Sequence, residues 1–123
     1  MQPLNVVLLQ SDSSTAQSLV SALANTFGAV HQVQSLGELR TSIAKHRAHI
    51  AILDMEAASI SDVEHLSREF PKACIVCTHR LADEDMWTAA VNAGAVDIHP
   101  PSDTRGILRT ALQNAALTQH ATA

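Results

Sequence analysis

Short apolar runs alternate with helical patterns along the whole chain. The five runs are three to five residues long and lie at 6–9, 30–34, 50–53, 75–77 and 95–98. Within most of them, apolar residues follow one another instead of alternating with polar ones. Continuous apolar strands are typical of a parallel sheet that helices cover on both faces.

Amphipathic patterns fill the segments between the runs. Their apolar residues recur three or four positions apart, as a helix that buries one face requires. The five sets are Leu19, Leu23 and Phe27; Leu36, Leu39 and Ile43; Val63, Leu66 and Phe70; Met86, Ala90 and Ala93; and Leu108, Ala111, Leu112 and Ala115.

Residues that begin or end helices support the same division. The candidate starts are Asp12 or Ser13, Ser35 with Glu38, Ser61 with Glu64, and Ser102 or Asp103, and the candidate stops are Gly28, Pro71 and Gly94. The two serine–glutamate pairs have the spacing of a capping box, while glycine and proline terminate helices. The pattern predicts an α/β fold of the (βα)5 type, a doubly wound, five-stranded parallel sheet with flavodoxin-like topology.

The chain of 123 residues has room for one domain, which we expect to span 1–123. Periodicity is lost at 117–123, so this segment is expected to be a frayed tail or the start of a linker. No apolar run reaches the length of a membrane span, and the first residues lack the pattern of a signal peptide. We therefore expect a soluble, cytoplasmic protein.

Composition removes several function classes. The formal net charge is −4 and the eight Lys and Arg residues are scattered, so there is no basic stripe for nucleic acid. The four glycines are too far apart for a phosphate-binding loop. Aromatic residues make up only 2%, which leaves a flavin or base-stacking site short of rings.

Cysteine and histidine residues favour structural roles. Cys74 and Cys77 form a C-x-x-C, but inside an apolar run, where residues three apart point to opposite faces of a strand. We expect both thiols to be buried and structural rather than redox-active. His46 and His49 are three apart with no further ligand nearby in the sequence, which argues against a zinc site.

Residues that follow the strands of a parallel sheet meet at one edge. Asp54 is the notable one, because it ends the run 50–53 and so brings a carboxylate to that edge. A single aspartate after a strand is also a common cap or turn residue. Its position alone leaves both roles open.

Four local sequences, in this order, carry a resemblance to a known family: Ile52-Leu53-Asp54, Val76-Cys77-Thr78, the turn at 92–97, and a proline-containing turn before the last helix. From the first strand to the last helix, the chain resembles the receiver domain of bacterial two-component response regulators. The resemblance implies that Asp54 is the phosphoacceptor and that Thr78 senses the phosphoryl group. It also implies a sensor histidine kinase or phosphotransfer protein as partner, and an effector domain in the same chain or in a partner protein.

The metal site of that family is altered in this chain. The family's first strand ends in two acids that hold Mg²⁺, whereas this chain has Gln10 and Ser11, followed by Asp12. Phosphoryl transfer to a carboxylate needs a cation to offset the negative charge. The remaining candidate ligands are Asp12, Asp54 and the backbone of Glu56, so we expect a weak or absent Mg²⁺ site. Asp12 has a second interpretation as the cap of the first helix.

Groups that relay a phosphate signal in the family are altered too. The lysine at the end of the fifth strand is replaced by a proline, or by His99 if the alignment shifts. Lys45 and Lys72 belong to the opposite edge of the sheet, and Ile98 stands in place of the family's aromatic switch residue. His79 or His99 would either donate a hydrogen bond to a phosphoryl group or be an ordinary polar residue of the edge.

Receiver domains usually contact partners through the fourth helix, fifth strand and fifth helix. On that face we expect Trp87 and Val91, with Arg105 and Arg109, to form a homodimer or effector-docking surface. The alternative is that the Trp87 ring packs against the fifth helix.

The leading hypothesis is a degenerate receiver, or pseudo-receiver. It would be a regulatory module that keeps Asp54, acts through protein–protein contacts with weak or no phosphorylation, and is not an enzyme. One alternative is a conventional Mg²⁺-dependent receiver in a phosphorelay, with Asp12 and a histidine replacing the missing groups. The other is a flavodoxin-like module that binds a small ligand. In each case we expect no contact of this domain with nucleic acid or membrane.

Overall fold

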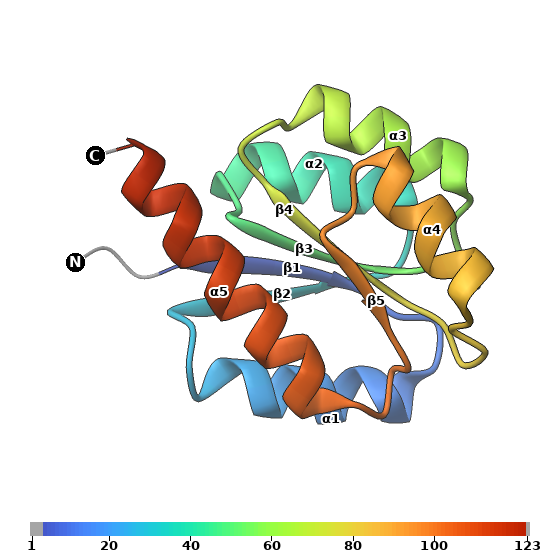
Figure 1. Ribbon diagram of the computed structural model, residues 1–123. Helices are drawn as coiled ribbons and strands as arrows, with labels where there is room; N and C mark the ends of the chain where they lie inside the picture. Colours follow the sequence, from blue (N-terminus) through green and yellow to red (C-terminus); the bar gives the residue numbers. More distant parts are fainter. Residues whose placement is uncertain (1–3, 123) are drawn as a thin grey trace.

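The computed structural model describes residues 4–122, and the side chains up to Asn114. Strands and helices alternate throughout (Figure 1). In chain order they are β1 (Asn5–Leu9), α1 (Ser13–Ala24), β2 (Ala29–Val33), α2 (Leu36–His46), β3 (Ile50–Asp54), α3 (Ile60–Glu69), β4 (Cys74–Thr78), α4 (Glu84–Ala93), β5 (Asp97–His99) and α5 (Thr104–Thr122). The predicted (βα)5 fold is confirmed. The tail expected at 117–123 lies outside the residues whose side chains are described, and it stays a prediction.

All five strands are parallel, in the order β2-β1-β3-β4-β5. Helices α2, α3 and α4 cover one face of the sheet, and α1 and α5 cover the other (Figure 1). The order reverses between β1 and β3, and in such sheets the crevice for ligands opens at the carboxyl ends of the strands there. No described helix is long and apolar enough to cross a membrane.

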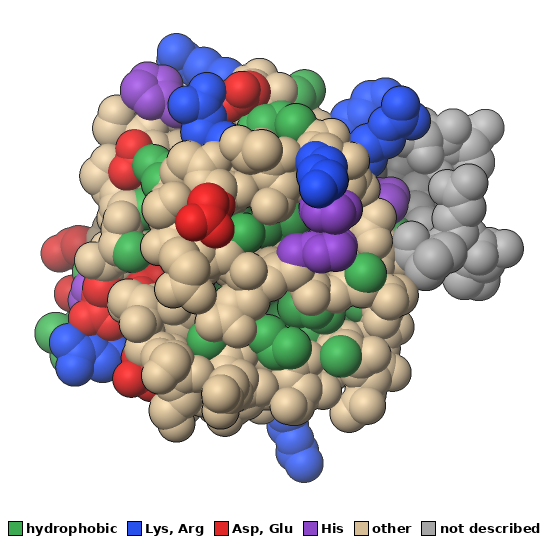
Figure 2. Space-filling model, turned by 180° about the vertical axis from the view of Figure 1, so that it is seen from behind, with side chains coloured by type: hydrophobic (Ala, Val, Ile, Leu, Met, Phe, Trp, Pro, Cys, Tyr) green, Lys and Arg blue, Asp and Glu red, His purple; other side chains and the backbone are tan. Residues whose placement is uncertain are grey.

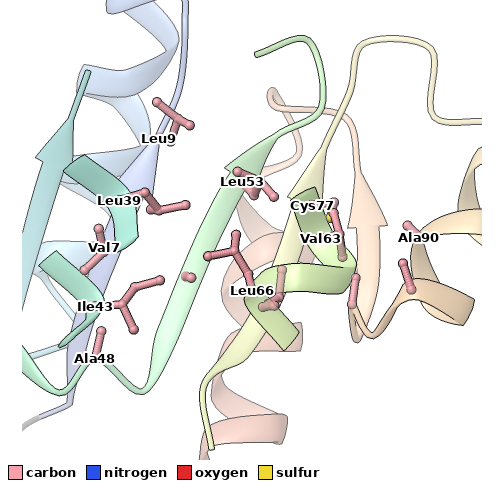
Figure 3. Close-up of a cluster of buried hydrophobic side chains, with 14 of the residues drawn as sticks. Val7, Leu9, Leu39, Ile43, Ala48, Leu53, Val63, Leu66, Cys77 and Ala90 are labelled. Carbon is pink, nitrogen blue, oxygen red and sulfur yellow. The ribbon is translucent and has the colours of Figure 1, made fainter. Parts of the chain in front are cut away.

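Two buried clusters explain why the strands are apolar on both faces. Val7 and Leu9 of β1 belong to the cluster under α2, α3 and α4, part of which is drawn in Figure 3. Val6 and Leu8 belong to the other cluster, under α1 and α5. Successive strand residues point to opposite faces, so a sheet covered on both sides buries every position.

The cysteines divide between the same two clusters. Cys77 lies in the cluster under α2, α3 and α4, and Cys74 in the one under α1 and α5. Both are free, buried thiols, and burial raises the pKa of each to about 12. The predicted structural role is confirmed, because a thiol with so high a pKa is a poor nucleophile.

Helix starts agree with the prediction except at α3. Asp12, Ser35 and Asp103 each accept a hydrogen bond from a first-turn amide of the helix that follows. The expected box of Ser61 with Glu64 is wrong: Ser59 caps α3 and forms a capping box with Asp62. Both pairs have the right spacing. The earlier start is favoured because it lets Ile60 pack on the core.

Helix ends and the last helix also depart from the pattern. Helix α1 ends at Ala24, before Gly28, whose amide instead donates to the Leu4 carbonyl as the chain enters β2. In the described part of α5 the buried apolar residues are Ile107 and Ala111, while Leu112 is 41% exposed. Of the predicted apolar face, Ala111 is buried and Leu108 packs on the core, whereas Leu112 is wrong. The side chain of Ala115 lies outside the described part.

Gly94 ends α4 as predicted, and for two reasons. Its φ of 120° lies in the region that favours glycine, and a Cβ there would collide with the side chain of Ser67 in α3. The glycine therefore permits both the turn and the close approach of the two helices. Strand β5 then starts at Asp97, two residues later than the apolar run suggested.

Candidate functional site

The candidate site lies where β1, β3 and β4 end side by side. Asp54 and Thr78 are the last residues of β3 and β4 and are direct partners in the ladder. Gln10 and Ser11 follow β1. Asp54 and Thr78 have no exposed surface, and Gln10 is 7% exposed. The sequence prediction that Asp54 and Thr78 reach the same edge of the sheet is confirmed.

Neutral donors surround the Asp54 carboxylate. Its Oδ2 accepts from the Ser11 amide at 2.9 Å, from the Ser11 hydroxyl, and from Gln10 Nε2 at 3.5 Å. Its Oδ1 accepts from the Glu56 amide at 2.9 Å. A buried carboxylate is costly unless hydrogen bonds replace its hydration. These donors supply that replacement with neutral groups.

Thr78 is connected to Asp54 indirectly. The Thr78 hydroxyl donates to Gln10 Oε1 at 3.1 Å, and the Gln10 amide nitrogen donates on to Asp54. The Thr78 carbonyl accepts from the Met55 amide at 2.8 Å, which ties the chain after β3 to the end of β4. No buried side-chain nitrogen or oxygen atom of the described residues lacks a hydrogen-bond partner.

The Asp12 side chain bonds to the first turn of α1 and not to Asp54. Its Oδ2 accepts from the Thr15 amide at 2.9 Å and from the Thr15 hydroxyl at 2.7 Å, and it caps α1. These two bonds, the one to the hydroxyl first, lower the pKa of the Asp12 carboxyl. Of its two predicted roles, the structure shows the helix cap.

The donor set does not fit Mg²⁺. The Asp54 oxygens already accept from protein donors, the Asp12 carboxylate caps a helix, and Glu56 pairs with Arg80. Among the described His, Cys, Asp and Glu residues, no three lie close enough together to hold a metal ion. Magnesium requires octahedral oxygen coordination, usually with one or two free carboxylates. The expected weakness of a Mg²⁺ site stays a prediction, since it concerns binding in solution.

A pocket of about 440 Å³ opens above the buried carboxylate. Its lining comes from the loops after β1, β3, β4 and β5 and from the first turn of α1: Gln10, Ser11, Asp12, Thr15, Glu56, Arg80 and Pro101. Arg80 and Glu56 form a two-pronged ion pair there, with an Nη2–Oε1 distance of 2.7 Å and an Nε–Oε1 distance of 3.0 Å. Hydrogen bonding to Glu56 is the main cause that raises the pKa of Arg80, and the Asp54 charge adds to it.

Sequence reasoning missed Arg80, although a signal was available. Asp54 and Thr78 are ladder partners, and Glu56 and Arg80 each follow their strand end by two residues. Because the two strands are paired at their last residues, the side chains of Glu56 and Arg80 are brought close together, and their opposite charges favour an ion pair. The role of Gln10 and Ser11 as donors to Asp54 was missed as well.

The two candidate histidines do not contact Asp54. His79 Nδ1 accepts from the Leu81 amide at 2.9 Å within its own loop. His99 Nε2 lies 2.8 Å from the Thr110 hydroxyl, and its ring is near Asp97 and Asp103. Pro101, not a cation, lines the pocket from the β5 side.

Trp87 is half-exposed on α4, at 46%. Its indole N–H donates to Asp97 Oδ1 at 3.0 Å, so the ring is tied to β5 and not to the fifth helix by this bond. Val91 is partly buried, and Arg105 and Arg109 are exposed on α5. The four residues expected to form an interaction surface thus present at least three accessible side chains.

Known proteins share this architecture at the level of fold. No protein-family model and no curated protein matches the chain. A response regulator from Thermotoga maritima is similar with a TM-score of 0.83 at 19% identity, covering 94% of this chain and 99% of that one. The N-terminal signal receiver domain of a two-component response regulator from Bacteroides fragilis gives 0.82 at 20% identity, over 93% and 98% of the two chains.

A longer regulator shares the fold as well. The RcsB response regulator of Salmonella typhimurium, solved in a study of its conformational dynamism for DNA interaction, has a TM-score of 0.80 at 19% identity. The match covers 98% of this chain and 62% of RcsB. The chain therefore has the fold of response-regulator receiver domains.

Proposed function

We propose that this chain is an atypical receiver, a cytoplasmic regulatory module of signal transduction that acts through protein–protein contacts with weak or no phosphorylation. The observation that carries the proposal is the hydrogen bonding of the buried Asp54 carboxylate. Asp54 stands at the position that the resemblance assigns to the phosphoacceptor, but neutral donors from Gln10, Ser11 and Glu56 surround its carboxylate. The shared fold with receiver domains supports the regulatory class.

Phosphoryl transfer to Asp54 would need changes at this site. An attacking carboxylate oxygen has to leave its hydrogen bonds, and each buried donor left unpaired costs about 1–3 kcal/mol. The transferred group also brings negative charge that a cation normally offsets. The nearest cation in the pocket is Arg80, which already pairs with Glu56. These contacts support slow or absent phosphorylation of Asp54.

The module would pass its signal through the surface made by Trp87, Val91, Arg105 and Arg109. Exposed tryptophan and arginine are enriched at interaction hot spots. The surface would bind an effector domain in the same chain, a partner protein or a second copy. A sensor kinase or phosphotransfer protein is a partner only if Asp54 reacts.

The decisive experiment is phosphorylation in vitro. The protein is incubated with acetyl phosphate and Mg²⁺, and intact mass is compared with that of Asp54→Asn treated in the same way. We expect no phosphoryl adduct, or a trace one. A full adduct on the wild type that the variant lacks would replace the proposal by the conventional phospho-accepting receiver, which the paired Asp54 and Thr78 favour.

Association tests the interaction surface. Sedimentation and pull-down with the native downstream segment are compared for Trp87→Ala and Asp54→Asn. Association lost with the first variant and kept with the second supports phosphorylation-independent docking. The reverse pattern contradicts it.

A further inference from the structure

Gln10 bridges the two central residues of the site. Its Nε2 donates to Asp54 Oδ2 at 3.5 Å, and its Oε1 accepts from the Thr78 hydroxyl at 3.1 Å. These two residues end neighbouring strands, and Gln10 directly follows a third strand, β1. One side chain therefore joins β1, β3 and β4 where they end.

An amide is suited to this position. It carries a donor and an acceptor on one planar group, so it can serve a carboxylate and a hydroxyl together. The opposite orientation of the amide would place its carbonyl oxygen against the Asp54 carboxylate. An acid at position 10 would put two carboxylates side by side in a buried site, where like charges repel strongly.

Ser11 completes the arrangement. Its amide and hydroxyl both donate to Asp54 Oδ2, so the strongest contacts to that oxygen come from one residue. The side chain of Asp12, the next residue, caps the N-terminus of α1. Three successive side chains are thus committed to hydrogen bonds within the protein, and none is left to bind a cation.

We infer that Gln10 and Ser11 form an internal lock, which is a set of hydrogen bonds around Asp54 and Thr78. In a receiver that can be switched, a bound cation and a phosphoryl group between these two positions would take its place. The lock holds Asp54 and Thr78 in a single arrangement without metal and without phosphorylation. The consequence for signalling rests on the proposed function: the lock would keep the module in one conformation toward its partners. The lock itself concerns only stability and hydrogen bonding.

Thermal melting of four proteins tests the lock. They are the wild type, Gln10→Glu, the double variant Gln10→Asp with Ser11→Asp, and Gln32→Glu, which adds the same charge at an exposed glutamine of β2. Each is melted in EDTA and in excess Mg²⁺. We expect the wild type and Gln32→Glu to melt alike in both conditions.

The two site variants should behave differently. In EDTA, Gln10→Glu and the double variant should melt roughly 5–10 °C lower, because a buried donor is lost and charge is added. Mg²⁺ should restore much of the loss in the double variant. Stabilisation of the wild type by Mg²⁺ would overturn the inference, and so would a Gln10→Glu variant that melts like Gln32→Glu.

A measurement on the wild type avoids the risk that variants fail to fold. In NMR spectra, the side-chain amide protons of Gln10 should exchange more slowly than those of Gln32. The backbone amides of Ser11 and Glu56 should not move on addition of Mg²⁺ and beryllofluoride. Equal exchange rates, or shifts confined to these amides, would show that the lock is absent.

The two proposals can fail separately. If Gln10 variants lose stability as expected but Trp87→Ala leaves association intact, the lock stands and the proposed interaction surface is wrong. If Gln10 variants are neutral while Asp54 stays unphosphorylated, the regulatory proposal stands and the lock is wrong.

Discussion

Two polar regions of the molecule, the carboxyl end of the sheet and a histidine pair at its β2 edge, are stabilised in different ways. At the carboxyl end, Asp54 is fully buried, and donors fixed by the backbone and by Gln10 and Ser11 surround it. Figure 2 shows most of the acidic side chains visible from behind at the left, the end at which the strands terminate. Within this acidic end, the buried Asp54 carboxylate is held by hydrogen bonds.

At the β2 edge of the sheet, two histidine rings support each other by stacking. His31 of β2 and His46 of α2 are half-buried and stack with their centroids 3.7 Å apart and their planes 7° from parallel. Partial burial, followed by the charges of His46 and Lys45, lowers the pKa of His31. The comparison teaches that hydrogen bonds from Gln10, Ser11 and Glu56 fix the Asp54 side chain in place, whereas stacking and partial burial tune the pKa of His31.

The largest effect should come from Asp54→Ala. Removing the carboxylate leaves the Ser11 and Glu56 amides and the Gln10 side chain without their acceptor. We expect a loss of about 2–4 kcal/mol in the free energy of unfolding, measured with urea. In a site crowded with carboxylates, removing one would relieve repulsion. A more stable Asp54→Ala variant would therefore contradict the account of the carboxyl end.

Asp12→Ala should have a smaller effect. The variant loses the cap of α1, so its urea midpoint should fall, but by less than that of Asp54→Ala. Because Asp12 contacts Thr15 and not Asp54, the loss should be the same in EDTA and in Mg²⁺. A loss seen only with Mg²⁺ would show that Asp12 turns inward to hold a cation.

The smallest effect is expected at the histidine pair, and it depends on pH. A lowered pKa means that the unfolded chain binds a proton at His31 more readily than the folded protein does. This contribution to stability is present above the unfolded value near 6.5 and is lost as pH falls through the folded pKa. His31→Gln should reduce the fall in urea midpoint between about pH 7.5 and pH 5.5.

His65→Gln is the matched control, because His65 is exposed on α3. It should leave the pH dependence as it is in the wild type. If the two variants give the same profile, the stacked pair does not govern the pH response.

Periodicity was sufficient to predict the elements, because burial on one helix face or both strand faces leaves a direct mark on the residue pattern. The errors lie where two local solutions compete. Ser59 and Ser61 both precede an acid at capping distance, and packing of Ile60 decided between them. In α5, Leu112 fits a four-residue spacing, but the orientation of the helix buries Ile107.

The sequence by itself determined the parallel sheet, the burial of both cysteines, and the arrival of Asp54 and Thr78 at one edge, because all strands of a parallel sheet end at the same edge and continuous apolar runs are buried on both faces. Only the tertiary structure decided what Gln10 and Ser11 do there. In the sequence, Gln10 and Ser11 show only that the two acids expected from the resemblance to receiver domains are absent at these positions. A hydrogen bond depends on distance and direction between groups on different strands, and those are set when β1 packs beside β3.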